Sequence, residues 1–406
     1  MVLDMKAVVT AKITEEYMER LQAIADSIVC TGRGYTGVKL STEEMREAIK
    51  DADIVIDGVE NIDGETMDAC RNLKVIACCR NEAFASIDID AATERGIPVI
   101  QAVGRNAISV AEYTIGILLA CCKNISTTDY LLRHTDKLAG AVYKDKEQEK
   151  KEGVKKPQIW STDPNGPAAL YGKYPELYGK KFGQIGYGSI GREVAKRAAA
   201  FGMELLIADP FLAPEAISGM NAKIVDLPML MRESDFISIN CNVNPSTEGM
   251  VNREMLSLMK PTAFIVNTAR APIMDYAALG EMLAEKKIAG AALDVFPLEP
   301  IPADDALLKL DNVVLTPHMA GQSREIPEHH SRIIMENLET LFRGERPETI
   351  CNPSVLEGWF EIHKDWIAKR WRKRSQYQAK LVNVSKNNYQ KFEKNIGKFM
   401  ELDSKK

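Results

Sequence analysis

Three glycines placed between an apolar run and a helix-forming segment constrain the fold of this chain more than any other feature. Residues 181–211 read KFGQIGYGSIGREVAKRAAAFGMELLIADPF, in which Gly186-x-Gly188-x-x-Gly191 precedes an alanine-rich segment. The next apolar run ends at Asp209, 18 residues after Gly191. A strand, a glycine turn, a helix and a second strand in this order predict a parallel β-α-β unit.

The rest of the chain repeats this alternation in two series, which predicts an α/β protein with two doubly wound parallel-sheet domains. The first series has β-rich runs at 6–11, 53–58, 74–79 and 97–102. The second has runs at 181–186, 203–208, 223–226, 236–240, 263–268, 289–295 and 312–317, one strand more than a basic sheet of six. Between the series, apolar spacing predicts a helix over 106–125. Residues 126–179 are polar and rich in Pro and Gly, which predicts a long surface excursion.

Composition excludes several classes of protein. A chain of 406 residues is too long for one ordinary core, and its net charge of −5 argues against nucleic acid as the main partner. No apolar run approaches the roughly 20 residues that a membrane span needs. Residues 1–21 lack the parts of a signal peptide, so we expect a cytoplasmic location. The eight cysteines form no CxxC pair, so we expect buried, reduced thiols and no metal site.

The glycine turn fits the binding of a dinucleotide. Gly186 permits a tight turn, Gly188 lets the backbone approach a pyrophosphate, and Gly191 allows close packing of helix on strand. The amides of Ser189 and Ile190 would then face the phosphates at the positive end of the helix.

The acidic residue that ends the following strand predicts which dinucleotide is bound. Asp209 would accept hydrogen bonds from the adenosine ribose hydroxyls, and its charge would repel a 2′-phosphate. NAD is therefore predicted in preference to NADP. The alternative is a doubly wound domain that binds no nucleotide, because a glycine pattern alone also occurs in ordinary turns.

Three later strands end in polar residues, and ligands of open α/β sheets sit beyond the carboxyl ends of the strands. The strands deliver Arg270, Asp294 and His318, and Glu299 follows shortly after Asp294. Taken alone, each has a structural explanation, such as an ion pair or a hydrogen-bonded core histidine. Their coincidence after a dinucleotide turn predicts that all four open onto one cleft.

These residue types suit the reduction of a ketone by hydride. His318 could protonate the oxygen that becomes a hydroxyl, and an adjacent carboxylate would orient its imidazole. A guanidinium, here Arg270, can bind a substrate carboxylate through two parallel hydrogen bonds. The remaining aspartate could hold the nicotinamide carboxamide.

The segments SVAEYTIGILLA, GYGSIGREVAKRAAAFGM, VNTARAPIMD, AALDVFPLEP and LTPHMAGQS resemble, in this order, signature blocks of the D-isomer-specific 2-hydroxyacid dehydrogenase family. The likeness covers about residues 45–345. It implies a flavodoxin-like substrate domain (1–104 and 320–350) around an inserted Rossmann NAD-binding domain (105–319) that includes the excursion. It also implies a small 2-keto or 2-hydroxy acid substrate and a homodimer.

The same resemblance implies roles for individual residues. Arg270, Glu299 and His318 would form the catalytic triad. Cys241 would contribute its backbone to the NAD site, so its thiol need not react. The residues implied to line the NAD site are Ser189, Ile190, Asp209, Cys241, Thr268, Ala269 and Asp294.

One loop departs from the family pattern. After the run at 74–79, glycines whose amides approach the substrate carboxylate are common, whereas this chain has Arg80-Asn81-Glu82-Ala83-Phe84. The bulkier residues predict a reshaped pocket in which Arg80 and Asn81 contact substrate together with Arg270. We expect that Arg80 could meet a second anionic group.

The C-terminal extension, residues 351–406, is basic and aromatic. From Glu357 onward it has 13 Lys or Arg against 6 Asp or Glu, with Trp359, Trp366 and Trp371 at roughly helical spacing. Such a stretch could bind anionic lipid, nucleic acid or an acidic partner. Alternatively, its aromatic side chains dock on the protein's own surface while its Lys and Arg face water.

Two functions remain open at this level. The first is an NAD-dependent dehydrogenase that interconverts a small 2-keto acid and its D-2-hydroxy acid. The second is an NAD(H)-sensing binding protein on the same fold, similar to the C-terminal-binding-protein co-repressors of this family. Turnover of keto acids with NADH would discriminate between them.

Overall fold

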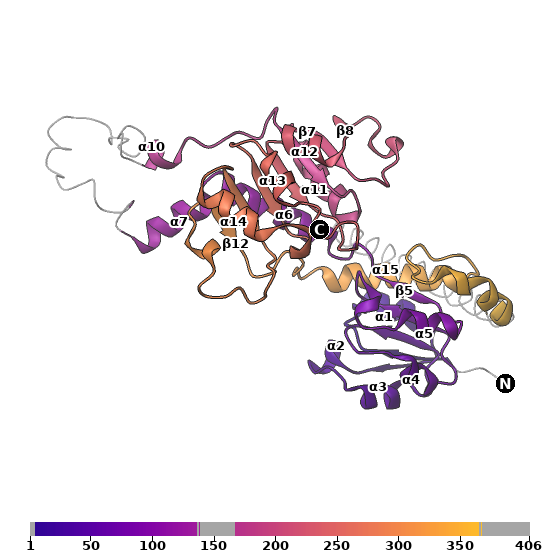
Figure 1. The fold of residues 1–406 in the computed structure, drawn as a ribbon. Coiled ribbons are helices and arrows are strands. Elements are labelled where there is room, and N and C mark those ends of the chain that lie inside the picture. Colours follow the sequence, from indigo (N-terminus) through magenta and orange to yellow (C-terminus); the bar gives the residue numbers. More distant parts are fainter. Residues whose placement is uncertain (1–4, 136–137, 139–166, 365–366, 368–406) are drawn as a thin grey trace, which may run out of the picture. The chain divides into compact units, whose positions relative to one another are not determined.

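The computed structural model describes residues 5–135, 138, 167–364 and 367 (Figure 1). The chain divides into two compact units, unit 1 with Met1–Arg105 and Arg324–Lys406, and unit 2 with Asn106–Ser323. Described segments from before and after unit 2 in the sequence therefore form one unit.

Unit 1 is built on a parallel sheet. Its strands are β1 (Lys6–Val9), β2 (Ser27–Cys30), β3 (Ile54–Asp57), β4 (Val75–Cys78) and β5 (Val99–Gln101). Its helices are α1 (Glu15–Gln22), α2 (Arg33–Thr36), α3 (Thr42–Ile49), α4 (Gly64–Asp68), α5 (Ile89–Glu94) and α15 (Ile326–Leu341), with 3-10 turns η1 (Ala83–Ala85) and η5 (Pro353–Val355). Within the described residues the strand order is β2-β1-β3-β4-β5, all parallel, which is the flavodoxin-like order.

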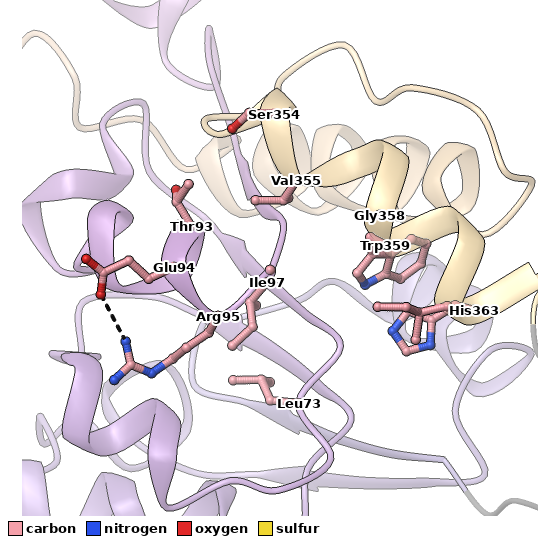
Figure 2. A pocket seen from close by; sticks show the side chains of 12 residues that line it. Leu73, Thr93, Glu94, Arg95, Ile97, Ser354, Val355, Gly358, Trp359 and His363 are labelled. Atoms are coloured by element: carbon pink, nitrogen blue, oxygen red, sulfur yellow. Dashed lines mark ion pairs between the residues drawn. The ribbon is translucent and has the colours of Figure 1, made fainter.

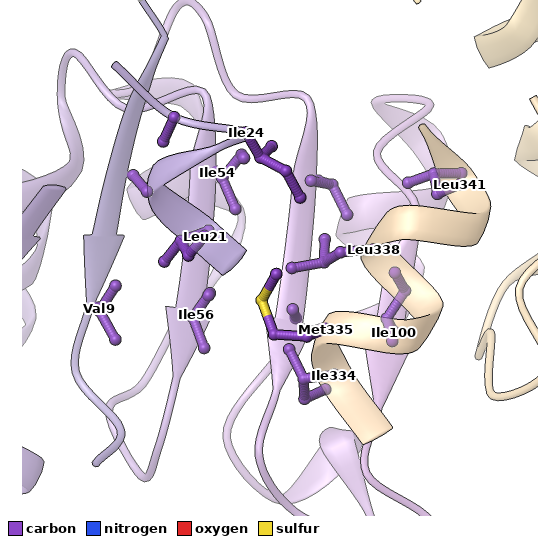
Figure 3. Close-up of a cluster of buried hydrophobic side chains, with 14 of the residues drawn as sticks. Val9, Leu21, Ile24, Ile54, Ile56, Ile100, Ile334, Met335, Leu338 and Leu341 are labelled. Atoms are coloured by element: carbon purple, nitrogen blue, oxygen red, sulfur yellow. The ribbon is translucent and has the colours of Figure 1, made fainter. Parts of the chain in front are cut away.

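Helices cover both faces of this sheet. Successive side chains of a strand point to opposite faces, so neighbouring residues join different clusters. On β1, Ala7 and Val9 join a cluster with α1 and α15, whereas Val8 joins a cluster with α3, α4 and α5. Figure 3 shows the first cluster, to which Leu21 of α1 and Leu338 of α15 both contribute. Helix α15, which follows unit 2 in the sequence, thus packs on a sheet formed by the start of the chain.

Strand β2 was not predicted from the sequence. Among the strands of the described segments it pairs only with β1, and it lies at the edge of the sheet with most of its side chains exposed. An edge strand buries too little for its sequence to show the apolar run that marks a core strand. Cys30, at its end, is exposed, so the expectation that the cysteines are buried is wrong for this residue.

Unit 2 contains the larger sheet. Its strands are β6 (Lys181–Ile185), β7 (Glu204–Ala208), β8 (Ala222–Ile224), β9 (Phe236–Ile239), β10 (Phe264–Asn267), β11 (Gly290–Leu293) and β12 (Val313–Leu315). Its helices are α6 (Ala107–Cys122), α7 (Ile125–His134), α10 (Pro167–Tyr171), α11 (Ser189–Ala200), α12 (Leu227–Glu233), α13 (Arg253–Ser257) and α14 (Tyr276–Ala284), with 3-10 turns η2 (Pro214–Ile217), η3 (Ala271–Ile273) and η4 (Ala306–Lys309).

The strand order of unit 2, over the described residues, is β12-β11-β10-β9-β6-β7-β8, and every pair is parallel. This is the doubly wound Rossmann order with one further strand, β12, at one edge. Helices α6 and α11 pack on one face, and α12, α13 and α14 on the other. The predicted fold class, two doubly wound parallel-sheet domains, is confirmed, as are all seven predicted strands of this unit.

The excursion at 126–179 differs from its prediction at both ends. Helix α7 forms the beginning of this segment. An ion pair between Asp129 and Arg133 (2.8 Å) and the stacking of Tyr130 on His134 support the helix. The short helix α10 and the buried Leu177 lie near its end. Residues 139–166, most of the excursion, lie outside the described residues.

Of the helices in the described segments, none is by itself long and apolar enough to cross a bilayer. Helices α6 and α7 would meet that criterion only as a pair, and the chain bends by 64° between them. All eight cysteines belong to described segments, and each is a free thiol.

The described start of the C-terminal extension docks on unit 1. Residues 356–364 are helical, and the buried Trp359 donates its Nε1–H to the carbonyl oxygen of Lys74 at 2.8 Å. Trp359 also stacks on Phe342. Figure 2 shows it beside a cavity of about 400 Å³, which Leu73 and Ile97 also line. For this aromatic residue the docking interpretation is confirmed, whereas Trp366 and Trp371 lie outside the described residues.

We expect Leu338→Ala to lower the free energy of unfolding by about 2–5 kcal/mol, because the side chain is fully buried and its loss leaves a cavity. Urea unfolding followed by circular dichroism measures this change. Glu336→Ala on the same helix is the control, since it removes only an exposed ion pair with Arg332. A similar small loss in both variants would contradict the packing of α15 on the sheet.

Candidate active site

The predicted site residues of unit 2 follow the carboxyl ends of neighbouring parallel strands. The glycine turn follows β6, and Asp209, Cys241 and Asp294 follow β7, β9 and β11. Strands β6 and β9 are neighbours although β7 and β8 separate them in sequence, so the strand order reverses between them. Such a switch point is where open α/β sheets bind ligands.

The glycine turn has the backbone that the sequence predicted. Gly186 has a φ of +85°, and a Cβ added there would lie 2.8 Å from the amide nitrogen of Cys241. A Cβ on Gly191 would lie 2.3 Å from the carbonyl oxygen of Gly186. Both positions therefore require glycine for the fold itself.

Gly188 is different, because a Cβ there would meet open space and its φ of −71° suits any residue. It is the N-cap of α11, and no side chain caps this end of the helix. The first amides of α11, including those of Ser189 and Ile190, have no intrahelical acceptor and present the positive end of the helix. This open, uncapped end fits the pyrophosphate of a dinucleotide.

Asp209 lies next to the glycine turn. Its carboxylate accepts the N–H of Tyr187 at 2.7 Å and the N–H of Phe211 at 2.9 Å. These contacts fix the carboxylate at the end of β7 and leave lone pairs on both oxygens for a ligand.

The loops after β9 and β10 carry the remaining predicted cofactor residues. Burial raises the pKa of the Cys241 thiol to about 11, so this thiol stays protonated near neutral pH. The hydroxyl of the buried Thr268 pairs with that of Thr114 on α6 at 2.7 Å. The N–H of Ala269 donates to Asn267. Hydrogen bonds thus hold the segment that leads to Arg270.

His318 and Glu299 form the central pair of the site. The Nδ1 of His318 donates to Oε2 of Glu299 at 2.7 Å, and the two side chains are 45% and 39% exposed. Burial works to raise the pKa of Glu299. The hydrogen bonds from His318 and from the amide of Phe296, together with the charges of His318 and Arg270, outweigh it and lower this pKa. The carboxylate is therefore ionised, and it leaves Nε2 of His318 accessible.

The loop that carries His318 is anchored by Asp294, a fully buried carboxylate. One oxygen accepts the hydroxyl of Thr316 (2.6 Å) and the amide of Met319 (2.8 Å), and the other accepts the amide of Ala320 (2.8 Å). His318 itself has a φ of +55°, a conformation that costs energy for a residue with a side chain. The anchor holds this strained residue in place, a role that the sequence did not reveal.

Arg270 is exposed at the end of the loop after β10. Its Nη1 donates to the carbonyl oxygen of Ala269 at 2.7 Å, and its own carbonyl oxygen accepts from Asn267. Its positive charge makes a small contribution to the lowered pKa of Glu299, after the hydrogen bonds from His318 and Phe296 and the charge of His318. The structure therefore brings Glu299 and His318 into direct contact in unit 2, and Asp294 holds the loop that carries His318. Arg270 belongs to the same unit, and only its charge is seen to act on Glu299.

The two predicted substrate residues of unit 1, Arg80 and Asn81, follow β4. Asn81 accepts the amide of Gly104 at 3.0 Å, whereas Arg80 lines a cavity. Three further cations line the same cavity, Lys12, Arg33 and Arg105, and the sequence analysis missed them. Lys12 stands just past β1, which was predicted, but Arg33 follows the unpredicted strand β2.

Comparisons with known proteins identify the family. Residues 116–320 match the family described as D-isomer specific 2-hydroxyacid dehydrogenase, NAD binding domain. The chain is 35% identical to the glyoxylate reductase of Thermofilum pendens, covering 87% of this chain and 96% of that protein. This chain belongs to the D-isomer-specific 2-hydroxyacid dehydrogenase family.

Two further similarities agree with this assignment. The chain is 36% identical to the D-3-phosphoglycerate dehydrogenase of Methanocaldococcus jannaschii, covering 86% of this chain but only 59% of that longer protein. The crystal structure of the TT0316 protein from Thermus thermophilus matches with a TM-score of 0.63 and 29% identity, over 86% of this chain and all of that one. As a member of the family, the chain binds a nicotinamide cofactor, and the open end of α11 fits it.

Two alanine variants of the glycine turn should differ in stability and in NADH binding. Gly186→Ala should destabilise the protein by about 1–3 kcal/mol, because it forces a positive φ on alanine and a clash with Cys241. Gly188→Ala should leave thermal stability nearly unchanged but weaken NADH binding by about 10-fold or more, since its Cβ would project where the pyrophosphate approaches. Thermal melting without cofactor and NADH titration measure the two effects. Normal NADH binding by a folded Gly188→Ala variant would contradict this placement.

Proposed function

We propose that this protein is an NAD-dependent dehydrogenase that interconverts a small 2-keto acid and its D-2-hydroxy acid by reversible hydride transfer. The observation that carries the proposal is the 2.7 Å contact between His318 and Glu299, within electrostatic reach of Arg270, in an NAD-binding unit of this family. When bound, the nicotinamide supplies the hydride or accepts it.

His318 acts as the acid and base. Because Nδ1 is engaged by Glu299, Nε2 can deliver a proton to the carbonyl oxygen during reduction and remove it from the hydroxyl during oxidation. The carboxylate of Glu299 fixes the orientation of the ring and stabilises the imidazolium. The anchor of Asp294 on the loop keeps this pair in position.

Arg270 binds the carboxylate of the substrate. Its guanidinium is exposed and can form two parallel hydrogen bonds with a planar carboxylate. This contact orients the neighbouring carbonyl and polarises it. Arg80 and Asn81 of unit 1 are proposed as further substrate contacts.

The NAD site is proposed to consist of the glycine turn and the loops beside it. Asp209 favours NAD over NADP, because a fixed carboxylate at the end of β7 repels a 2′-phosphate. Asp294 would reach the nicotinamide carboxamide in addition to holding its loop. The full proposed set is Gly186, Gly188, Ser189, Ile190, Gly191, Asp209, Cys241, Thr268, Ala269 and Asp294.

The boundaries implied by the family resemblance are likewise proposed for this chain: substrate domain 1–104 and 320–350, NAD-binding domain 105–319, and extension 351–406. A homodimer is proposed on the same basis. The relatives described above are named for different substrates, a glyoxylate reductase and a phosphoglycerate dehydrogenase, so their names support the reaction type without choosing the acid.

We expect His318→Ala to lower kcat by about 10²–10⁴, the effect of losing a general acid, while NADH affinity is retained. The decrease in NADH absorbance with glyoxylate, hydroxypyruvate, pyruvate and larger keto acids measures turnover, and an NADH titration measures affinity. His134→Ala is the matched control, because His134 is an exposed histidine of α7.

Near-normal kcat in His318→Ala would remove this residue from the proposed role. An absence of turnover on every keto acid, combined with tight NADH binding by the unmodified chain, would instead favour the NAD(H)-sensing binding protein.

We expect Asp209→Ala to weaken NADH binding by about 10-fold, the loss of hydrogen bonds to a charged acceptor, and to relax discrimination against NADPH. Titration of the variant with both cofactors measures the ratio of their dissociation constants. Melting without cofactor separates this effect from any loosening of the turn, since Asp209 also holds Tyr187 and Phe211. An unchanged ratio of the two dissociation constants would show that this carboxylate does not distinguish the ribose of NADH from that of NADPH.

A further inference from the structure

A chain of hydrogen bonds inside unit 2 begins at Asn267, the last residue of β10, whose side chain is fully buried. Its Oδ1 accepts the N–H of Ala269 at 3.0 Å, and its Nδ2 donates to the carbonyl oxygen of Arg270 at 3.1 Å. The same Nδ2, which has two hydrogens, also donates to the hydroxyl oxygen of Tyr276 at 3.3 Å. This side-chain amide therefore holds the backbone of Arg270 and connects it to Tyr276.

The hydroxyl of Tyr276 continues the chain of hydrogen bonds toward the loop after β11. Tyr276 is the first residue of α14, and its hydroxyl donates to the carbonyl oxygen of Val295 at 2.5 Å. Burial is the main cause that raises the pKa of this phenol, so the hydroxyl stays protonated near neutral pH. It therefore acts as an acceptor toward Asn267 and as a donor toward Val295 at the same time.

A single peptide group carries the contact from Tyr276 to Glu299. The carbonyl of Val295 and the N–H of Phe296 belong to one planar unit. The carbonyl accepts from Tyr276, and the N–H donates to Oε1 of Glu299 at 3.0 Å. The other carboxylate oxygen, Oε2, accepts from Nδ1 of His318 at 2.7 Å. A hydroxyl that fixes and polarises one end of a rigid peptide group also fixes and strengthens the donor at its other end.

Packing alone does not account for this hydroxyl. The ring of Tyr276 packs against a buried cluster that includes Leu279 and Leu293, and a phenylalanine ring would fill the same space. The hydroxyl adds a bridge between the loops that follow β10 and β11, two strands that pair in the sheet. One of these loops carries Arg270, and the other carries Glu299.

We infer that the hydroxyl of Tyr276 is a positioning group of the active site, which fixes the carboxylate of Glu299 relative to the loop of Arg270. The imidazole of His318 follows, because its Nδ1 donates to that carboxylate. The effect on catalysis rests on the proposed function, whereas the coupling of the two loops is a property of unit 2 itself. Tyr276 acts through Glu299 and does not touch the reacting atoms.

Hydrogen exchange of the full chain, followed by mass spectrometry, tests the coupling without any substrate. Tyr276→Phe keeps the ring and removes only the hydroxyl. We expect peptides that contain Ala269 and Phe296 to exchange about 10-fold faster in this variant, since their amides belong to the hydrogen-bonded chain. The amide of Tyr187 donates to Asp209 instead, so peptides from the glycine turn should exchange at the rate of the unmodified chain.

Tyr178→Phe is the matched control, because it removes a hydroxyl from a side chain of the same unit that is 79% exposed. It should leave exchange unchanged in both loops. Unchanged exchange of the peptides with Ala269 and Phe296 in a folded Tyr276→Phe variant would overturn the coupling.

NADH oxidation with the keto acid that the unmodified chain reduces best tests the effect on catalysis. We expect Tyr276→Phe to lower kcat/KM by about 10-fold and to leave the dissociation constant of NADH unchanged. The loss of kcat/KM at alkaline pH should also move to lower pH. The reason is that a carboxylate of Glu299 that is held less firmly stabilises the imidazolium of His318 less well.

The pH dependence separates positioning from stability. If Tyr276 served stability alone, its variant would melt at a lower temperature but keep the pH dependence of the unmodified chain. A folded Tyr276→Phe variant with normal kcat/KM and normal pH dependence would overturn the positioning role.

These outcomes also separate the two proposals. If exchange rises in both loops of Tyr276→Phe but the unmodified chain reduces no keto acid, the dehydrogenase proposal fails and the coupling of the loops stands. If the unmodified chain reduces a keto acid and Tyr276→Phe is normal in exchange and in kinetics, the positioning role fails and the dehydrogenase proposal stands.

Discussion

The buried carboxylate of Asp294 is the interaction on which the geometry of the loop at residues 316–320 depends. It accepts one hydroxyl and two backbone amides from residues 316–320, and so fixes a segment in which His318 has a positive φ. A strained residue persists only where its surroundings determine its conformation. The short distance from His318 to Glu299 therefore depends on the hydrogen bonds that the buried Asp294 makes in unit 2.

Parallel strands explain why the polar residues of each unit gather as they do. The carboxyl ends of neighbouring parallel strands meet at one edge of a sheet, so residues far apart in sequence are brought together. In unit 2 this edge carries the glycine turn, Asp209 and His318. In unit 1 it carries Arg80 and the other cations of the cavity. The same topological rule thus yields an uncapped helix end in one sheet and a positively charged cavity in the other.

Much of this arrangement could be predicted from the sequence because core strands and glycine turns leave local signals. The apolar runs of unit 2 and the glycines at 186, 188 and 191 are of this kind. Strand β2 left no such signal, since an edge strand buries little, and Arg33 beyond it was missed for the same reason. The anchoring role of Asp294 and the hydrogen bonds of Tyr276 depend on contacts distant in sequence, which no local pattern encodes.

The position of β12 has a consequence for how this scaffold can change. In the part of the chain that the structure describes, it forms the edge of its sheet and pairs with β11 alone, so the segment that carries His318 borders the core on one side only. Its loop could be lengthened, shortened or exchanged without rebuilding the strands that hold the dinucleotide, provided that an anchor equivalent to Asp294 were kept. Separate evolution of reactivity and cofactor recognition follows from the position of the proposed proton-transfer group, His318, at a border of the sheet.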